Sequence, residues 1–185
     1  MRWIILSLVC LSLNCTAQAV QSFSLTNVTD GKTISLEDFS SSPGVVIIFT
    51  SINCPYDGYY LSRIKELTEA YNSKTPVLLI NSNTKESADQ MKSYVEQHKL
   101  FIPYLADKEQ KVLVNLNPRK NPECFLLQNA GGEFTVVYRG AIDDNPQTAS
   151  EANNYYLKDA ITKLLSKQKI EIPDVRPVGC SIRRD

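Results

Sequence analysis

The chain has 185 residues, of which 43% are hydrophobic and 22% are charged, and its formal net charge at pH 7 is zero. A chain of this length and composition can bury one core of domain size. It has no basic excess to neutralise phosphates and no long charge run, so we do not expect it to bind nucleic acid.

Residues 1–19 have the layout of a secretory signal peptide. Arg2 gives a positive start, and residues 3–13 form an uncharged apolar run. This run is too short to span a bilayer, which takes about 20 residues, and Ala17 and Ala19 supply the small residues of a cleavage site. We therefore expect cleavage after Ala19 and export, without a transmembrane segment, to the periplasm or the exterior of a bacterial cell.

A lipid anchor at Cys15 is the alternative to soluble export. The residue before this cysteine, Asn14, is bulky and polar, whereas lipidation motifs have small residues there. Soluble export is therefore the favoured prediction.

The cysteine content limits the possible chemistry. The chain has five cysteines, and Cys54, Cys124 and Cys180 lie beyond the expected cleavage site. An odd number in an exported protein implies a free thiol or an intermolecular pair. A structural zinc site needs four ligands, and His98 is the only histidine. We therefore expect no bound metal, and no cofactor is indicated.

The first half of the chain alternates between strands and helices. Segment 23–36 reads as an N-terminal extension with a short hairpin. Residues 45–49 form a continuous, mostly β-branched apolar run, which is typical of a strand buried on both faces. Residues 58–71 have apolar side chains near helical spacing, residues 77–80 form a second buried strand, and residues 88–98 form a helix.

The second half adds a hairpin and a closing helix. Residues 112–116 indicate a short helix. Residues 124–127 and 135–138 flank a glycine-containing turn signal, so they read as an antiparallel hairpin. Residues 157–165 carry apolar side chains at the spacing of a strongly amphipathic helix.

The order β-α-β-α-α-β-β-α predicts an α/β fold, a three-layer thioredoxin-like sandwich with a mixed central sheet. We assign this domain to residues 20–167. Residues 168–185 contain Pro173, Pro177 and Gly179, so we expect an extended tail that packs on the domain.

Cys54 is the strongest candidate for chemistry. It follows a buried strand and a short loop, and it precedes Pro55, which fits the first turn of a helix. The free N–H groups and positive partial charge of a helix N-terminus favour a thiolate, the nucleophilic form of cysteine. The placement favours a reactive thiol over the alternative, a small buried core residue.

Two neighbours of Cys54 are candidate substrate-binding residues. Asp57 lies where a dithiol oxidoreductase has its second cysteine; it either caps the helix or, if ionised near the sulfur, raises the thiol pKa. Tyr56, with Tyr59 and Tyr60, can form an apolar rim for a peptide or a peroxide. Ordinary half-buried packing is the alternative for these tyrosines.

Pro122 directly precedes the strand that begins near Cys124. From this position we predict a cis bond between Asn121 and Pro122 that brings backbone polar groups beside Cys54, although only about 5–6% of such bonds are cis in general. Asn121 and Pro122 are therefore further candidate substrate-binding residues. A trans proline that ends the loop is the alternative.

Six segments together resemble the peroxiredoxin-like branch of the thioredoxin superfamily, the redoxin or AhpC/TSA-type proteins. The resemblance covers about residues 23–183 and implies a thioredoxin fold with Cys54 at the position of the first active-site cysteine. The segments are FTSINCPYDGYY (49–60), LLINSN (78–83), IPYLADKEQKV (102–112), NPECFLL (121–127), VVYRGAIDD (136–144) and PVGCSIR (177–183).

The family's peroxidase signature, Pro-x-x-x-Thr-x-x-Cys, is incomplete in this chain. Ile47 stands at the proline position and Ser51 at the threonine position. These departures favour thiol–disulfide exchange over peroxide reduction. The missing second cysteine at position 57 keeps a non-catalytic binding module open as a third interpretation.

Cys180, in the tail, is the candidate partner of Cys54. From Lys167 to Cys180 an extended chain reaches roughly 43 Å at about 3.3 Å per residue, and a domain of this size has a radius of gyration of about 15 Å. This reach allows a Cys54–Cys180 disulfide with Cys180 as the resolving cysteine. It equally allows a free Cys180 in a tail that only packs on the domain. Cys124 lies in a predicted core strand, so we expect it to be structural and treat it as a second candidate.

The sequence therefore predicts an exported thiol–disulfide oxidoreductase with Cys54 as nucleophile. Its expected partner is a protein thiol or disulfide. The alternatives are a thiol peroxidase that acts on a peroxide through a sulfenic acid and a binding module without catalysis.

Overall fold

The computed structural model describes residues 19–185. The predicted signal peptide, residues 1–19, lies outside the described part of the chain except for Ala19, and so does the alternative lipidation site at Cys15. Within the described part, no helix is long and apolar enough to cross a membrane.

Helices and strands alternate along the chain in the predicted order, with several short additions. The helices are α1 (Pro55–Tyr71), α2 (Ala88–His98), α3 (Lys111–Leu116) and α4 (Tyr156–Leu165), with two 3-10 turns, η1 (Leu36–Phe39) and η2 (Ala149–Glu151). The strands are β1 (Ser24–Asn27), β2 (Thr33–Ser35), β3 (Gly44–Phe49), β4 (Val77–Asn81), β5 (Tyr104–Ala106), β6 (Lys120–Asn121), β7 (Glu123–Ala130), β8 (Glu133–Gly140), β9 (Asp174–Val175) and β10 (Cys180–Ser181).

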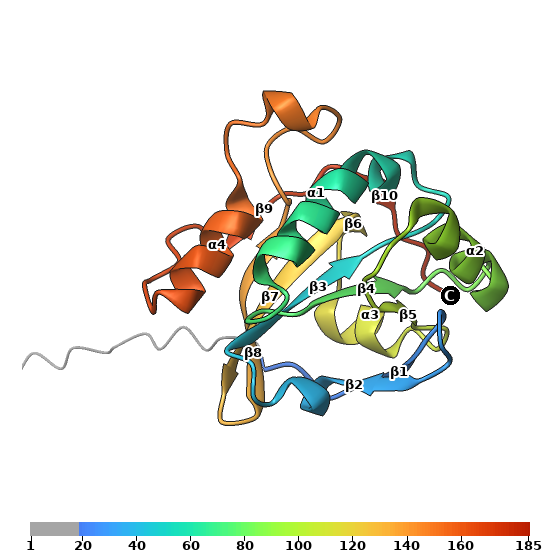
Figure 1. Cartoon of the computed structure of the whole chain (residues 1–185), viewed down its shortest axis with the longest axis horizontal. Coiled ribbons are helices and arrows are strands. Elements are labelled where there is room, and N and C mark those ends of the chain that lie inside the picture. Colours follow the sequence, from blue (N-terminus) through green and yellow to red (C-terminus); the bar gives the residue numbers. More distant parts are fainter. Residues whose placement is uncertain (1–18) are drawn as a thin grey trace, which may run out of the picture.

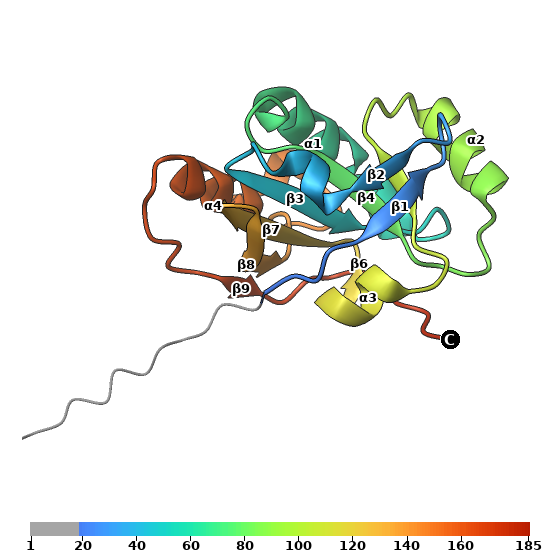
Figure 2. The ribbon, with the colours of Figure 1, turned by 90° about the horizontal axis from the view of Figure 1, so that it is seen from below.

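An eight-stranded mixed sheet forms the middle layer, in the order β2-β1-β5-β4-β3-β7-β8-β9. Strands β3, β4 and β5 run parallel to one another, and β7 runs antiparallel to β3. Helices α1, α2 and α4 cover one face of the sheet, and α3 covers the other (Figure 1, Figure 2). This arrangement confirms the predicted three-layer α/β fold.

Strand β3 is the centre of the core, and all six of its residues are buried. Val46 and Ile48 pack in the cluster on the α1 side, whereas Val45, Ile47 and Phe49 pack in the cluster on the α3 side. Successive side chains of a strand point to opposite faces, so a strand covered on both sides needs a continuous apolar run. The carboxyl end of this strand leads directly to Cys54.

The sequence did not predict the four shortest strands of the second half, β5, β6, β9 and β10. Each has two or three residues, which is too short for a recognisable alternation of apolar and polar side chains. Two of them belong to the tail: β9 runs parallel to β8, and β10 runs antiparallel to β6. The tail is therefore extended, as predicted, and it also forms strands with the domain.

Gly140 allows β9 to join the sheet. Its φ is +132°, a conformation that side-chain-bearing residues rarely adopt. A Cβ at this position would lie 1.9 Å from the carbonyl oxygen of Val175. The pairing of β8 with β9 therefore requires glycine here.

Candidate active site

Cys54 is the N-cap residue of α1, at the end of the loop that follows β3. Its backbone is extended, and Pro55 begins the helix in the first position, as the sequence predicted. The Cys54 side chain is only 5% exposed. Its sulfur thus lies at the positive end of a 17-residue helix, where a thiolate is stabilised.

Cys54 forms a disulfide with Cys180 of the tail. The two sulfur atoms are 2.01 Å apart and the Cα atoms 5.9 Å apart, across 126 residues of sequence. Of the two arrangements that the sequence left open for Cys180, the structure has the paired one. Cys124 is free and fully buried in β7, where burial raises the pKa of its thiol well above the ordinary value. The expectation that Cys124 is a core residue is therefore confirmed.

The cis bond predicted between Asn121 and Pro122 is present. The carbonyl oxygen of Asn121 lies 3.2 Å from the sulfur of Cys54. Because the disulfide sulfur carries no hydrogen, this is a close contact in the oxidised protein; a reduced Cys54 thiol can donate a hydrogen bond to the same oxygen. Asn121 also pairs with Cys180 in the β6–β10 ladder, so one residue contacts both halves of the disulfide.

Gly179 sets how closely the tail approaches the cis-proline segment. A Cβ on Gly179 would lie 2.1 Å from the carbonyl oxygen of Asn121 and 3.2 Å from the nitrogen of Pro122. Both are main-chain atoms, so a flexible side chain cannot yield to make room. The residue before Cys180 must be glycine for the tail to lie in this position.

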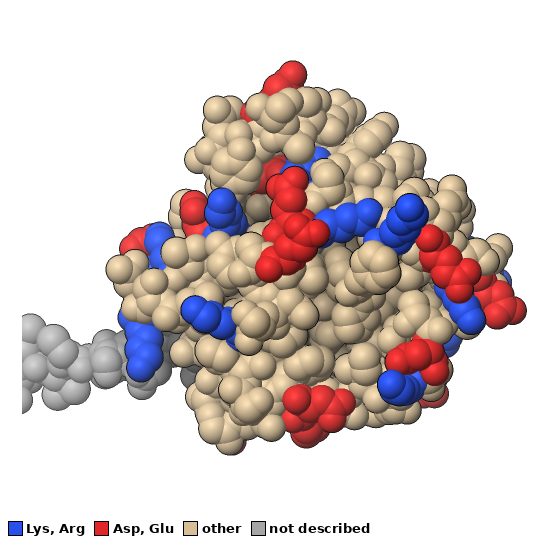
Figure 3. All heavy atoms as spheres, viewed as in Figure 1, with Lys and Arg blue, Asp and Glu red and all other residues tan. Residues whose placement is uncertain are grey.

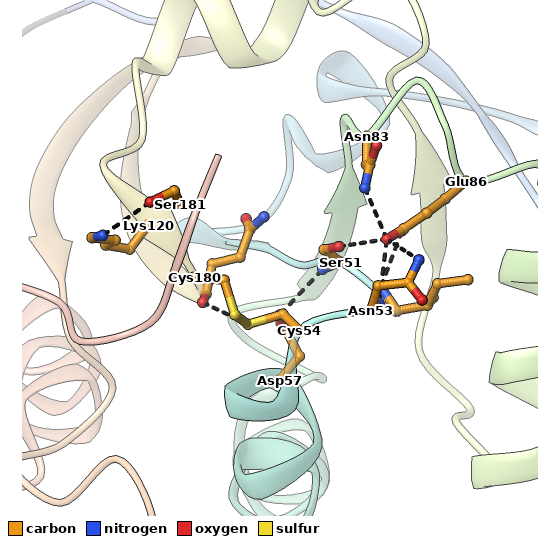
Figure 4. The surroundings of a disulfide bond; sticks show 11 residues. Ser51, Asn53, Cys54, Asp57, Asn83, Glu86, Lys120, Cys180 and Ser181 are labelled. Atoms are coloured by element: carbon orange, nitrogen blue, oxygen red, sulfur yellow. Dashed lines mark hydrogen bonds between the residues drawn. A yellow bond between two sulfur atoms is a disulfide. The ribbon is translucent and has the colours of Figure 1, made fainter. Parts of the chain in front are cut away.

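Glu86, which the sequence analysis did not identify, organises the loop before Cys54 (Figure 4). Its Oε1 accepts a hydrogen bond from the Ser51 hydroxyl at 2.5 Å, and its Oε2 accepts one from the Ile52 amide at 3.0 Å. The other donors to this carboxylate are the amide and side chain of Asn53 and the side chains of Asn81 and Asn83. The carboxylate therefore fixes the main chain that carries Cys54.

The hydrogen bonds keep Glu86 ionised although it is buried. Burial acts to raise the pKa of its carboxyl, but hydrogen bonds from Asn81, Ser51 and the Ile52 amide outweigh burial and lower the pKa below the ordinary value. The sequence contained a signal for this site, because the polar segment 82–86 follows β4 at the sheet edge where β3 also ends. Functional groups gather at such carboxyl ends of parallel strands.

Asp57 lies one helical turn after Cys54 and is 1% exposed. One carboxyl oxygen accepts a hydrogen bond from the Ser51 amide at 3.2 Å, and the other has no partner among residues 19–185. Burial raises the pKa of Asp57 well above its ordinary value, against hydrogen bonds from Thr50 and Ser51 that act to lower it, and the nearby charge of Glu86 raises it further. Asp57 therefore keeps its proton to higher pH than an exposed carboxyl does, and in the protonated form it puts no negative charge beside Cys54.

A cavity of about 150 Å³ borders the disulfide. Ser51 and Cys54 line one side, and tail residues 180–183 line the other. Tyr56 and Tyr59 stack edge to face on the first turns of α1, with ring centres 5.9 Å apart, and Tyr59 is 48% exposed. The tail therefore forms one wall of the cavity, and a substrate that reaches Cys54 would have to bind beside the tail or displace it.

The structure thus brings Cys54, Cys180, Asn121 and Pro122 together, while Asp57 lies buried below the thiol. Contact of Tyr56 or Asp57 with a substrate stays a prediction. Lys, Arg, Asp and Glu side chains are interspersed over the face seen in Figure 3, with no broad area of one sign. Among residues 19–185, no group of three or more His, Cys, Asp or Glu is arranged to hold a metal ion.

Comparison with known proteins agrees with the resemblance seen in the sequence. A profile described as the AhpC/TSA family matches residues 16–142. No curated protein sequence matches the chain.

Several solved structures share the fold. An uncharacterized conserved protein from Geobacillus kaustophilus is 26% identical, with a TM-score of 0.81 over 91% of this chain and 92% of that one. The exposed lipoprotein thioredoxin of Streptococcus pneumoniae is 21% identical, with a TM-score of 0.61 over 80% and 99% of the two chains. The peroxidoxin BcpB of Mycobacterium tuberculosis is 14% identical, with a TM-score of 0.61 over 83% and 98%. The last two similarities are evidence for a thioredoxin-like fold alone.

Proposed function

Since this chain belongs to the AhpC/TSA family, we propose that it is a thiol–disulfide oxidoreductase whose redox pair is Cys54 and Cys180. The disulfide between these residues is the observation that supports the proposal most strongly. It joins a sulfur at a helix N-terminus to a cysteine on a separate tail, so opening it exposes a stabilised thiolate. The partner is a protein thiol or disulfide.

Reduction of the protein begins at Cys180. Cys54 is only 5% exposed, whereas Cys180 is half-buried. A partner thiolate attacks the sulfur of Cys180, a new disulfide forms between them, and Cys54 leaves as the thiolate. Exchange is faster when the leaving thiol has the lower pKa, which the helix N-terminus provides for Cys54. A second partner thiolate then releases Cys180, so that the partner loses two electrons and ends as a disulfide.

The reverse half of the cycle uses Cys54 as the nucleophile. The Cys54 thiolate attacks a disulfide of an oxidised partner, forming a mixed disulfide and releasing one partner thiolate. Cys180 then attacks the sulfur of Cys54, closes the intramolecular disulfide and releases the second partner thiolate, and both released thiolates take protons from solvent. Asn121 and Pro122 present their main chain to the partner as they do to the tail, and contact of Tyr56 with the partner is part of the proposal.

Peroxide reduction is the second candidate, because the matching family includes peroxide-reducing thiol enzymes. In that reaction the Cys54 thiolate would attack one peroxide oxygen and become a sulfenic acid as the O–O bond breaks and the other oxygen leaves, after protonation, as water or an alcohol; Cys180 would then condense with the sulfenic acid and release a second molecule, water. The Ser51 hydroxyl, at the threonine position of the peroxidase signature, donates to Glu86. Its proton is therefore unavailable as a donor to a peroxide at Cys54, which favours exchange.

Two assays decide between these functions. We expect the protein to accelerate the dithiothreitol-driven reduction of insulin and to consume hydrogen peroxide and cumene hydroperoxide no faster than a Cys54→Ser variant. Peroxide consumption that depends on Cys54, without insulin reduction, would support the peroxidase instead. Inactivity in both assays would leave a binding module.

Export is part of the same proposal. Its support is the signal-peptide pattern of residues 1–19 and the disulfide, since such bonds persist in oxidising compartments. We expect the protein expressed in a bacterial host to be recovered from the periplasm with Val20 as its first residue. Retention in the membrane with a lipid on Cys15 would favour the lipoprotein alternative, and recovery of the uncleaved chain from the cytoplasm would contradict export.

A further inference from the structure

The tail beyond Cys180 is bound to the domain at its very end. Gln110 contacts this segment twice: its side-chain nitrogen donates to the carbonyl oxygen of Arg183 at 3.0 Å, and its side-chain oxygen accepts from the amide of Asp185 at 3.0 Å. Both contacts are to main-chain atoms two residues apart. One glutamine amide therefore binds the tail as a neighbouring strand would.

Gln110 is itself held in place. It is 6% exposed, and its side-chain nitrogen also donates to the carbonyl oxygen of Ser82 at 3.0 Å. Its backbone is left-handed, with φ 55° and ψ 25°, directly before α3. A buried side chain with fixed hydrogen bonds loses little further entropy when it binds, so this amide is ready to receive the tail.

Two further contacts strengthen this end of the tail. Arg184 donates to the side chain of Asn117 at 2.8 Å and to the carbonyl oxygen of Pro118 at 2.7 Å. Ile182 packs against the core cluster on the α3 side of the sheet. The segment Ile182–Asp185, which we name the distal anchor, is therefore fixed independently of the disulfide.

The tail is also attached on the other side of Cys180. Strand β9 pairs with β8, and Asp174 forms an ion pair with Arg119 at 2.8 Å, which in turn pairs with the fully buried Glu123. With only this attachment, the five residues after Val175 would let Cys180 move up to about 17 Å away. With both attachments, its range is far smaller.

From this geometry we infer that Gln110 is a positioning residue that keeps Cys180 opposite Cys54 after the disulfide has opened. The inference rests on the proposed exchange function only in that it concerns the same two thiols. When Cys54 carries a mixed disulfide, the anchored Cys180 thiolate attacks the Cys54 sulfur, closing the Cys54–Cys180 bond and releasing the other thiol. Holding reacting groups in place raises their effective concentration, so closure is fast and mixed disulfides are short-lived.

The test is the equilibrium of the protein with reduced and oxidised glutathione, read by alkylation and mass spectrometry as the fraction with the Cys54–Cys180 bond. It gives the effective concentration of one thiol at the other and needs no partner protein. We expect Gln110→Ala to lower this value about tenfold, the usual worth of one or two hydrogen bonds. Gln97→Ala, on the exposed face of α2, is the matched control and should leave it unchanged.

A chain that ends at Ile182 removes the tail's side of the same contacts and does not alter the buried Gln110, so it folds even if Gln110→Ala does not. It should lower the effective concentration by at least as much, and adding Gln110→Ala to it should cause no further loss. An unchanged equilibrium in the shortened chain would overturn the inference, as would losses that multiply in the double variant, because Gln110 would then act through Ser82. Since the readout is not activity, failure in the insulin assay alone would contradict the proposed function and leave this inference standing.

Discussion

The two halves of the Cys54–Cys180 disulfide are held in different ways. Cys54 lies on a loop whose amides and side chains converge on the buried carboxylate of Glu86, and it begins a long helix. Cys180 lies in a two-residue strand of an otherwise irregular tail, which is held by the pairing of β10 with β6 and, at its end, by Gln110 and Arg184. The difference indicates that Cys54 is held within the domain and Cys180 by a tail bound to its surface, so a substrate sulfur can replace Cys180 in the bond to Cys54 while the tail stays attached.

Replacing the two cysteines one at a time should have the largest effects. Cys54→Ser removes the nucleophile and should lower the rate of insulin reduction on the order of 10³-fold or more, as loss of a covalent nucleophile does elsewhere. Cys180→Ser keeps the nucleophile and removes the closing thiol, so mixed disulfides between Cys54 and partner proteins should accumulate on non-reducing gels. Cys124→Ala is the control and should retain exchange; an active Cys54→Ser protein would contradict the assignment.

Gly179→Ala tests the approach of the tail to the cis-proline segment. The added Cβ would meet the Asn121 carbonyl oxygen at 2.1 Å, and overpacking of this kind costs about 1–3 kcal/mol. We expect the effective concentration of Cys180 at Cys54, measured with glutathione, to fall about 10- to 100-fold. Gly58→Ala adds a Cβ with nothing within 4 Å in α1 and should leave the value unchanged. Equal values for the two variants would show that close approach of Gly179 is not required.

Glu86→Gln tests how the loop that carries Cys54 is held. The neutral amide cannot replace the carboxylate as an acceptor of so many hydrogen bonds, and bonds to a charged group are worth about 1.5–3 kcal/mol each. We expect the free energy of unfolding in urea at pH 7 to fall by about 2–3 kcal/mol. Because the folded-state pKa of Glu86 is below 4.5, its contribution is present above that pH and is lost as the pH falls through the folded pKa. The variant and the wild type should therefore converge in acid, and Glu96→Gln, on the exposed face of α2, should lose little stability at any pH.

Asp57→Asn should have the opposite and smallest effect. The folded-state pKa of Asp57 is raised above 3.8, so the folded protein holds this proton to higher pH than the unfolded chain does. The free energy of unfolding therefore falls as the pH rises from 3.8 through the folded pKa, and at neutral pH the wild type is less stable by that amount. The neutral amide of the variant avoids this loss, so we expect the midpoint of thermal unfolding at pH 7 to rise by about 2–4 °C. A lower midpoint at pH 7 would indicate that Asp57 is ionised and stabilising.

The sequence predicted the position of Cys54 well and the position of Cys180 poorly. Cys54, Pro55 and the strand before them form one continuous pattern, and the position of Pro122 before a strand was enough to predict its cis bond. The contact of Glu86 with Ser51 joins residues 35 apart in the sequence, and the contact of Gln110 with Arg183 joins residues 73 apart. Such contacts depend on how the chain folds back, and no local pattern contains that information.

The pairing of Cys180 illustrates the same limit. The reach of the tail allowed a disulfide with Cys54, but reach alone could not separate a paired from a free cysteine. Gly140 and Gly179 decide the path of the tail, because main-chain atoms approach where a Cβ would stand. In the sequence Gly179 indicated only an extended tail, and no pattern singled out Gly140.

The most direct test of exchange through Cys54 and Cys180 is a timed reaction of the oxidised protein with a reduced dithiol protein, stopped by alkylation and mapped by mass spectrometry. We predict that the Cys54–Cys180 bond is lost as the partner's disulfide forms in equal amount, through an intermediate joined at Cys180. A Cys54–Cys180 bond that stays intact, or isolated protein in which both cysteines are alkylated from the start, would contradict it.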